Sequence, residues 1–324
     1  MNLEKKKILV TGGTGFIGSA IVNKLINLGC SVNIISMPND PLWKIEDISQ
    51  CKFYSEDLRD LEKAEKLMEK IQPEIIFHLA GIINTNLNKN AINQNYSLNL
   101  DVTKNTLIAL NEYNYDLFIN IGSGNEYGDI NPPFKESDRE RPISPYSASK
   151  IAATFFCEMV SNVYKKSIIT VRPFLIYGPK QISDSLIPSL IYYGIEKKPL
   201  SLTKCEQVRD FVYIDDVADA FVYLAQNVDK IKKMGIFNVG SGIGLKIIEV
   251  VNLIKQKIKD TKYLIGAKPY RPGETMNHYA SIEKIKNAIN WTPKWNLEAG
   301  IDSTIKWWKN NRDIWIKNKN IWEN

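Results

Sequence analysis

Tyr146 and Lys150 have the types and the spacing that proton transfer requires. They stand four positions apart in the run Tyr-Ser-Ala-Ser-Lys. Positions i and i+4 of a helix share a face, so the phenol and the ammonium would address the same small volume. A neighbouring positive charge lowers the pKa of a phenol, which makes the tyrosine a proton donor or acceptor. The same spacing occurs in ordinary surface helices, so the rest of the sequence decides its meaning.

Ser123 lies in the run Gly-Ser-Gly-Asn-Glu-Tyr-Gly, directly after a strand-like segment at residues 116–121. In parallel α/β sheets the carboxyl ends of the strands line the ligand crevice. A hydroxyl at that edge can bind a substrate carbonyl or alkoxide. The alternative is a serine that only caps a glycine-rich turn. The order Ser123, Tyr146, Lys150 favours the active-site interpretation.

A glycine-rich run at residues 11–18, Thr-Gly-Gly-Thr-Gly-Phe-Ile-Gly, predicts a dinucleotide-binding turn. Gly12, Gly15 and Gly18 have GxxGxxG spacing, and Gly13 gives an overlapping GxGxxG. Glycines let the backbone approach a pyrophosphate, and the following helix offers free N–H groups and the positive end of its dipole. A turn without a ligand is the alternative, but the strand before it and the helix after it favour a dinucleotide.

The end of the second strand bears on which dinucleotide is bound. An acid there binds the ribose hydroxyl of NAD, and its absence leaves room for the phosphate of NADP. Here the strand ends at Ser36, with no adjacent arginine, and the nearest acid is Asp40. The sequence therefore favours NADP over NAD, while Asp40 could still turn inward.

Short apolar strands alternate with helices through the first half of the chain. This pattern predicts an α/β fold with a doubly wound parallel sheet of the Rossmann type. Strands are expected at residues 8–10, 32–35, 74–79, 116–121 and 168–171. Helices are expected at residues 16–28, 98–111, 145–163, 187–195, 247–258 and 282–289.

Composition excludes several other classes of function. The 324 residues are 44% apolar and 24% charged, with a net charge of +6 and no apolar run long enough to span a bilayer. We expect a cytoplasmic protein with no membrane or nucleic-acid partner, because no basic stripe with interleaved aromatics appears. Four scattered cysteines indicate reduced thiols, and two distant histidines argue against a metal site.

Further motifs make the chain resemble the extended short-chain dehydrogenase/reductase family of nucleotide-sugar epimerases, dehydratases and reductases, from about residue 6 to 308. The most specific is Pro-Tyr-Ser-Ala-Ser-Lys at residues 145–150; others are His-Leu-Ala-Gly at 78–81, Arg-Pro-Phe-Leu-Ile-Tyr-Gly-Pro at 172–179 and Arg-Pro-Gly-Glu at 271–274. The resemblance implies a smaller, mainly C-terminal substrate domain. The expected dinucleotide-binding domain is 1–172 plus about 212–240, and the nucleotide-sugar domain about 173–211 and 241–324.

The resemblance also implies roles for single residues. Tyr146 would be the acid/base at a sugar oxygen, Ser123 would bind the same oxygen, and Lys150 would hold the nicotinamide ribose and lower the pKa of Tyr146. Asn99 would order the active-site backbone, and Asp57 would contact the adenine. The full set implied to bind the cofactor is Gly12, Gly15, Phe16, Ile17, Gly18, Ser36, Asp57, Leu58, Leu79, Ala80, Gly81, Asn99, Tyr146 and Lys150. The set implied to bind the substrate is Ser123, Asn125, Leu175, Arg209 and Arg271, with the two arginines on the diphosphate.

Two departures from the family pattern restrict the reaction. The dehydratases carry an Asp-Glu or Ser-Glu pair directly after the serine or threonine, where this chain has Gly124 and Asn125. Glu126 is one position too late and is expected to point elsewhere, so dehydration is disfavoured. Leu175 replaces the asparagine usual in the Arg-Pro-Phe-Asn motif, so the substrate must be held differently there.

Three enzymatic outcomes and one different class follow. The favoured hypothesis is 4-reduction of a nucleotide-linked 4-keto-6-deoxyhexose; the alternatives are C4 epimerisation with tightly bound NAD and oxidation without return. A dinucleotide-sensing protein on the same fold is the different class, disfavoured because such proteins typically lose the tyrosine or the lysine. Relatives commonly dimerise through two helices of each subunit, here residues 98–111 and 145–163, so a homodimer is expected.

Overall fold

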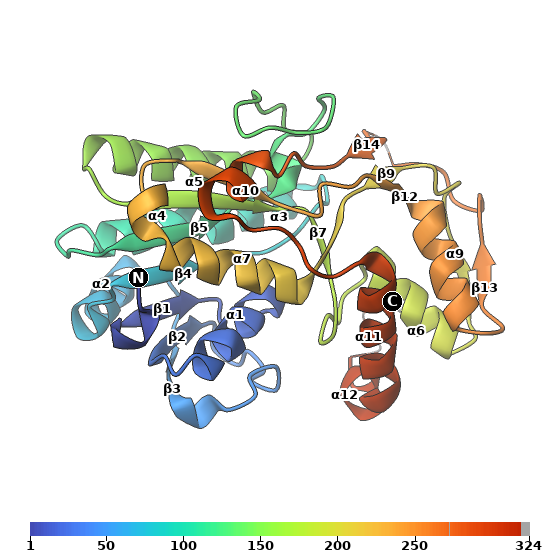
Figure 1. The fold of residues 1–324 in the computed structure, drawn as a ribbon, viewed down its shortest axis with the longest axis horizontal. Coiled ribbons are helices and arrows are strands. Elements are labelled where there is room, and N and C mark those ends of the chain that lie inside the picture. The colour runs from blue at the N-terminus through green and yellow to red at the C-terminus, as the bar shows by residue number, and fades with distance from the viewer. Residues whose placement is uncertain (272, 319–324) are drawn as a thin grey trace.

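A seven-stranded parallel sheet forms the centre of the molecule in a computed structural model that describes residues 1–271 and 273–318 (Figure 1). The strand order is β11-β6-β5-β4-β1-β2-β3, as in a doubly wound Rossmann sheet. The strands are β1 (Ile8–Thr11), β2 (Val32–Ser36), β3 (Cys51–Ser55), β4 (Ile75–His78), β5 (Leu117–Ile121), β6 (Ile168–Pro173) and β11 (Ile236–Val239). The fold class expected from the sequence is confirmed.

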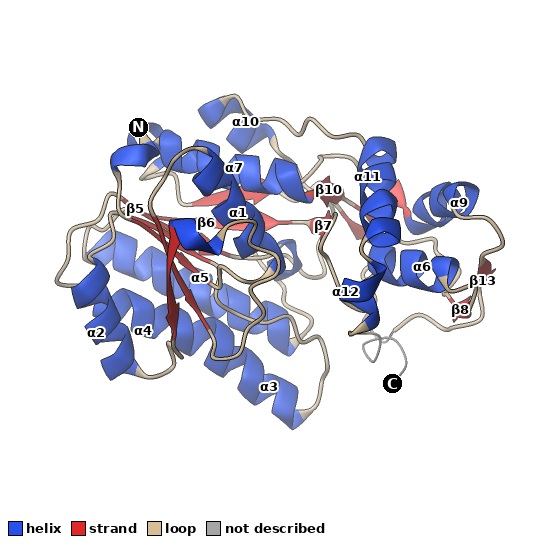
Figure 2. Cartoon of the chain, turned by 90° about the horizontal axis from the view of Figure 1, so that it is seen from below, coloured by secondary structure: helices blue, strands red, loops and turns tan. Residues whose placement is uncertain are grey.

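Helices cover both faces of this sheet, because every strand except β3 is buried on both sides (Figure 2). On one face the apolar core contains residues of α1 (Phe16–Asn27), α7 (Ile214–Gln226), α8 (Val228–Ile231) and α10 (Glu283–Ile289). On the other face it contains residues of α2 (Leu61–Ile71), α4 (Val102–Ala109) and α5 (Pro145–Val163). The short helices η1 (Leu3–Lys5), η2 (Ile48–Gln50), α3 (Lys89–Asn95) and η4 (Gly124–Glu126) complete this part of the chain.

A second apolar core lies at the C-terminal side of the molecule (Figure 1). It packs α6 (Leu186–Ile195), α9 (Ile247–Lys257), α11 (Leu297–Asn310) and α12 (Arg312–Ile316). Three small sheets accompany these helices: β7 (Leu175–Tyr177) with β10 (Phe211–Tyr213), β12 (Leu245–Lys246) with β9 (Val208–Arg209) and β14 (Asn277–His278), and β13 (Lys262–Leu264) with β8 (Pro199–Ser201). No described helix has the length and apolarity to cross a bilayer.

The structure adds three details to what the sequence predicted. The helix expected at 98–111 begins with a π-helical segment, η3 (Tyr96–Asp101), before α4. The sequence did not predict β3, an edge strand whose side chains are only partly buried and whose pattern is therefore weak. The expected second domain included residues 283–291, but Ile285 and Trp291 are buried in the core of the main sheet.

Candidate active site

Helix α5 carries Tyr146 and Lys150 on one buried face, as the spacing predicted. Ser144 caps the helix by accepting a hydrogen bond from the Ser147 N–H at 3.1 Å, and Pro145 occupies the first turn, where a missing N–H costs nothing. Tyr146 is 4% exposed and Lys150 is 6% exposed. Both side chains therefore face the sheet rather than the solvent.

Ser123 reaches Tyr146 from the carboxyl end of β5. The Ser123 hydroxyl lies close enough to the Tyr146 phenol to act on its pKa, which brings the predicted pair of hydroxyls together. Lys150 Nζ donates to the Ile121 carbonyl at 2.9 Å, at the end of the same strand. The geometry thus gathers Ser123, Tyr146 and Lys150 at the carboxyl edge of the parallel sheet.

The expected lowering of the tyrosine pKa by Lys150 is wrong for this arrangement. Burial raises the pKa of Tyr146 to about 12, and the Glu126 charge adds to it, while the bond from Ser123 opposes the change. Burial also lowers the pKa of Lys150 to about 8. The sequence supplied the spacing but not the depth of burial, and desolvation of the phenolate is the largest influence on the pKa of Tyr146.

The glycine turn between β1 and α1 is built for close backbone approach. A Cβ atom on Gly12 would lie 2.8 Å from Ala80 N, and one on Gly13 would lie 2.7 Å from Ile34 Cγ2. Gly15 is exposed and caps α1 without any side-chain hydrogen bond, so the helix N-terminus keeps its N–H groups available. These features fit a pyrophosphate held by the backbone.

Gly81 follows β4 and lies close to Asn99 and to Lys150 of α5. A Cβ atom there would lie 2.6 Å from Asn99 Oδ1 and 3.5 Å from Lys150 Nζ. Asn99 accepts a hydrogen bond from the Ile82 N–H at 2.9 Å and donates to Ser149 Oγ at 3.0 Å. Asn99 therefore ties the loop after β4 to α5, a geometry consistent with the ordering role that the resemblance implied.

An acid does reach the glycine turn from beyond the end of β2. Thr14 Oγ1 lies 2.9 Å from Ser36 Oγ and donates to Asp40 Oδ2 at 3.0 Å. Asp40 has therefore turned inward, the outcome that the sequence had left open. A carboxylate thus lies beside the glycine turn, near the end of β2, which weakens the argument for NADP.

Among the other residues expected at the cofactor, Asp57 is paired rather than free. Its carboxylate accepts hydrogen bonds from Arg59 Nε at 2.9 Å and from Arg59 Nη2 at 2.5 Å, which lower its pKa. Leu58 is 3% exposed and belongs to the sheet core. Phe16, Ile17, Gly18, Leu79 and Ala80 lie around the glycine turn and the end of β4.

The two arginines expected on the diphosphate differ in their surroundings. Arg209 Nη2 donates to Glu274 Oε1 at 2.6 Å, and the arginine side chain is 16% exposed. Arg271 is exposed, and its carbonyl accepts from the Glu274 N–H at 3.0 Å. The Arg209–Glu274 pair therefore links β9 to the loop that carries Arg271, while Pro272 of that motif lies outside the described residues.

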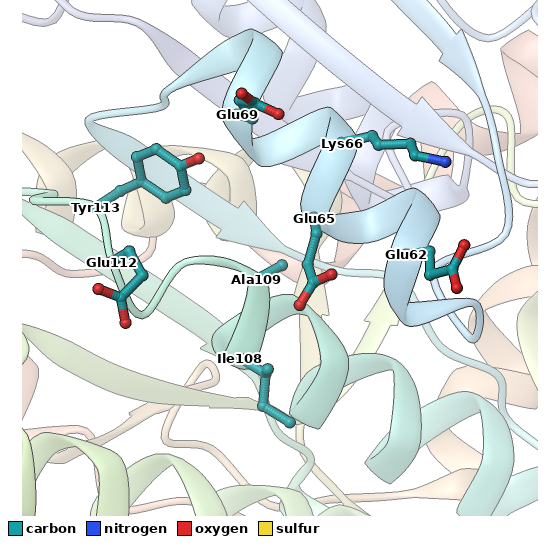
Figure 3. Close-up of a pocket in the computed structure, with 8 residues that line it drawn as sticks. All are labelled: Glu62, Glu65, Lys66, Glu69, Ile108, Ala109, Glu112 and Tyr113. Carbon is teal, nitrogen blue, oxygen red and sulfur yellow. The ribbon is translucent and has the colours of Figure 1, made fainter.

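A shallow surface groove between α2 and α4 contains none of these residues. It is lined by Glu62, Glu65, Lys66, Glu69, Ile108, Ala109, Glu112 and Tyr113 (Figure 3). Its four glutamates make it acidic, which is unfavourable for an anionic ligand. The candidate active site is therefore at the sheet edge and not in this groove.

The comparison with known families agrees with the geometry. The model of the NAD dependent epimerase/dehydratase family matches residues 8–240, from β1 through the end of β11. The chain belongs to this family. The match covers the glycine turn, Ser123, Tyr146 and Lys150, and it confirms the family resemblance drawn from the sequence.

Named family members include both dehydratases and epimerases. The dTDP-glucose 4,6-dehydratase of Haemophilus influenzae is 29% identical, over 93% of this chain and 97% of the relative. The UDP-glucuronic acid 4-epimerase of Bacillus cereus, solved with UDP-glucuronic acid and NAD, is 27% identical, with a TM-score of 0.85 over 94% of this chain and 99% of that one. The UDP-glucose 4-epimerase of Thermotoga maritima, solved with UDP-glucose, is 26% identical, with a TM-score of 0.84 over the same shares.

The position after Ser123 leaves little space for a side chain. A Cβ atom on Gly124 would lie 3.0 Å from His278 Cε1 and 3.2 Å from the Phe174 ring. His278 is 9% exposed, its Nε2 has no partner among the described residues, and burial lowers its pKa to about 4. A neutral imidazole thus fills the space that an acid at position 124 would enter, and the sequence gave no sign of this contact.

Two further residues expected to bind the substrate are Asn125 and Leu175. They directly follow Gly124 and Phe174, which take part in this contact. Asn125 is exposed, and its N–H donates to Ser123 Oγ at 3.2 Å. Leu175 begins β7, where its N–H donates to the Asp210 carbonyl at 3.0 Å and its side chain packs against the second core. The leucine therefore offers apolar contact where an asparagine would offer an amide.

Proposed function

We propose that this family member is a nucleotide-sugar oxidoreductase that moves a proton and a hydride at one sugar carbon. The observation that carries the proposal is the buried constellation of Ser123, Tyr146 and Lys150 beside the glycine turn. When bound, the dinucleotide supplies or accepts the hydride. Tyr146 gives or takes the proton at the sugar oxygen, and Ser123 holds that oxygen by a hydrogen bond.

Within this chemistry we propose 4-reduction of a nucleotide-linked 4-keto-6-deoxyhexose. Elimination of water requires an acid next to the serine, and the chain has Gly124 and Asn125 there. The close approach of His278 to Gly124 leaves little room for such a side chain. Both observations support a reaction confined to the carbon that Tyr146 serves.

C4 epimerisation is the second candidate. Relatives of similar size named as 4-epimerases were solved with NAD, and epimerisation uses the same serine, tyrosine and lysine. The contact of Asp40 with Thr14 supports a site that holds NAD. Under this alternative the dinucleotide is regenerated in each cycle and stays bound.

We also propose that the protein acts as a homodimer through α4 and α5. Phe155, Met159 and Val163 form an apolar stripe along α5, exposed by 51%, 39% and 64%. Ile108 on α4 is 42% exposed. Large apolar side chains at helical spacing on the surface favour a protein contact.

Whether the dinucleotide is consumed or retained during turnover distinguishes the candidate functions. The purified protein is denatured, any released dinucleotide is identified, and native protein is then given 4-keto and 4-hydroxy nucleotide sugars. Stoichiometric loss of NADH or NADPH on a keto sugar supports the reductase, while retained NAD with no net consumption supports the epimerase. A 4-keto-6-deoxy product from a 6-hydroxy sugar would contradict both.

Replacement of Tyr146 by phenylalanine tests whether the protein is an enzyme of this kind. We expect kcat to fall by about 10²- to 10⁴-fold, the usual contribution of a positioned acid or base, with dinucleotide binding retained. Tyr164→Phe, at the exposed end of α5, is the matched control. Unchanged turnover in Y146F would refute the mechanism, and dinucleotide binding without any turnover in the wild type would favour a sensor.

A further inference from the structure

Glu126 is a carboxylate with no exposed surface, three residues after the catalytic serine. Its Oε1 accepts a hydrogen bond from the Ser123 N–H at 2.8 Å. Its Oε2 accepts from Thr154 Oγ1 at 2.9 Å and from Arg172 Nε at 2.8 Å. Both carboxylate oxygens are therefore occupied by protein donors, which agrees with the expectation that Glu126 points away from the substrate.

These donors come from three different elements. Ser123 follows β5, Thr154 lies on α5, and Arg172 lies on β6. Thr154 is one turn beyond Lys150 and two turns beyond Tyr146, so all three share a helix face. One carboxylate thus connects the backbone of the catalytic serine to the face of the helix that carries the tyrosine and the lysine.

The surroundings hold this carboxylate in a fixed position. The Arg172 side chain is fully buried, and its Nη2 lies 2.5 Å from Glu140 Oε1. Its guanidinium lies 4.6 Å from the centre of the Tyr127 ring. A Cβ atom on Gly122 would lie 2.5 Å from Glu126 Oε1, so only a glycine at position 122 leaves space for the carboxylate. A buried ion network of this kind costs desolvation energy, so its position beside the site argues for a role in geometry.

We propose that Glu126 is a positioning residue that holds the Ser123 hydroxyl in register with the Tyr146 hydroxyl. The inference rests on the proposed function only in that these two hydroxyls share one sugar oxygen. Arg172 acts through Glu126 by compensating its buried charge. Loss of the carboxylate frees the turn after β5 from α5, and the two hydroxyls then meet less often in a productive geometry.

The charge of Glu126 has a second consequence at the site. Tyr146 faces the Ser123 hydroxyl and the Glu126 carboxylate. Burial raises the pKa of the phenol most, and the Glu126 charge raises it further. Lys150 faces Glu126 and the Cys157 thiol, and it lies near His78, which is buried and neutral with a pKa of about 3. Removal of the Glu126 charge therefore lowers the pKa of both Tyr146 and Lys150.

Three substitutions test the proposal. Glu126→Gln removes the charge with little change in shape; Thr154→Val removes only the tie to α5; Glu140→Gln removes a carboxylate from Arg172 without touching Ser123. We expect kcat to fall about tenfold or more in E126Q and severalfold in T154V, with the KM for the dinucleotide nearly unchanged, because only the reacting geometry is lost. E140Q is expected to lose stability but to keep the pH profile.

Two readouts do not depend on turnover, so they distinguish failure of this inference from failure of the proposed function. Amide exchange at the Ser123 N–H is expected to be faster in E126Q than in E140Q at equal global stability. The pKa of Lys150 can be followed by NMR of its Cε. We expect this pKa to fall below about 8 in E126Q and to remain at the wild-type value in T154V. Unchanged amide exchange at Ser123 together with an unchanged pKa of Lys150 in E126Q would overturn the proposal.

Discussion

The carboxylate of Asp40 accepts a hydrogen bond from Thr14 Oγ1 at 3.0 Å, which brings the loop after β2 onto the glycine turn. Ser36, at the strand end itself, lies against the same threonine. The acid that binds a ribose hydroxyl of the dinucleotide can thus lie four residues beyond its usual position at the end of β2. We expect this relationship to favour NAD over NADP.

We predict that Asp40→Asn weakens NAD binding by about tenfold or more, because a hydrogen bond to a charged group contributes roughly 1.5–3 kcal/mol. NADP binding should weaken less or improve, since the carboxylate that repels its phosphate is gone. Dissociation constants for both dinucleotides, measured by calorimetry, check this. Asp47→Asn, in the same loop but on the cap of η2, is the control and should leave both constants unchanged. Wild-type protein that binds NADP more tightly than NAD would contradict the assignment.

Lys150 should lower the stability of the folded protein at neutral pH. Burial lowers its pKa from 10.5 to about 8, so between these values the unfolded state binds more protons than the folded state. The free energy of unfolding therefore rises with pH through this window. The loss of stability caused by burying the charged Lys150 is fully present below about pH 8. We predict that Lys150→Met is more stable than the wild type by on the order of 3 kcal/mol at pH 7, with a gain that shrinks toward pH 10.

Denaturant unfolding at several pH values measures this difference. Lys230→Met, on the exposed surface of α8, should show no such dependence on pH. The same Lys150 variant should lose turnover, because it lacks the ammonium that the proposed mechanism needs. A variant less stable than the wild type at pH 7 would show that the bond to the Ile121 carbonyl outweighs the burial of the charge.

The sequence could predict the sheet and the catalytic helix because their signals are local. Buried parallel strands appear as short apolar runs, and α5 begins with a serine cap and a proline in its first turn. Ser123, Tyr146 and Lys150 could be grouped because strand ends meet at one edge of a parallel sheet. Glycines in a strand–turn–helix context predicted a tight turn between β1 and α1, and the structure packs Gly12 of that turn against the end of β4.

The rest depends on contacts between distant segments. The depth of Tyr146 in the fold, which reverses the expected direction of its pKa shift, follows from packing and not from spacing. The space beside Gly124 is occupied by His278, which arrives from a strand far along the chain. The network of Glu126 and Arg172 joins residues whose separate motifs carry no sign of the pairing.

The contact between Gly124 and His278 predicts an energetic coupling. Gly124→Ala places a methyl group 3.0 Å from the imidazole, and we expect it to cost about 1–3 kcal/mol of stability, the usual penalty for overpacking. His278→Ala should also destabilise, because it empties space between Phe134 and Phe174. The double variant should be more stable than the sum of the single effects, since the second change relieves the first. Additive effects in denaturant unfolding would show that the methyl group finds room without the imidazole moving.

The stripe on α5 predicts the oligomeric state. Phe155→Glu places a charge at the first residue of the stripe, and burial of an unpaired carboxylate in an apolar interface is strongly unfavourable. We expect the wild type to be a dimer and the F155E variant a monomer at micromolar concentration, measured by light scattering after size-exclusion chromatography. Leu264→Glu, at a leucine of β13 that is 49% exposed, is the control and should remain a dimer. A monomeric wild type, or a dimer that survives F155E but not L264E, would move the interface away from α4 and α5.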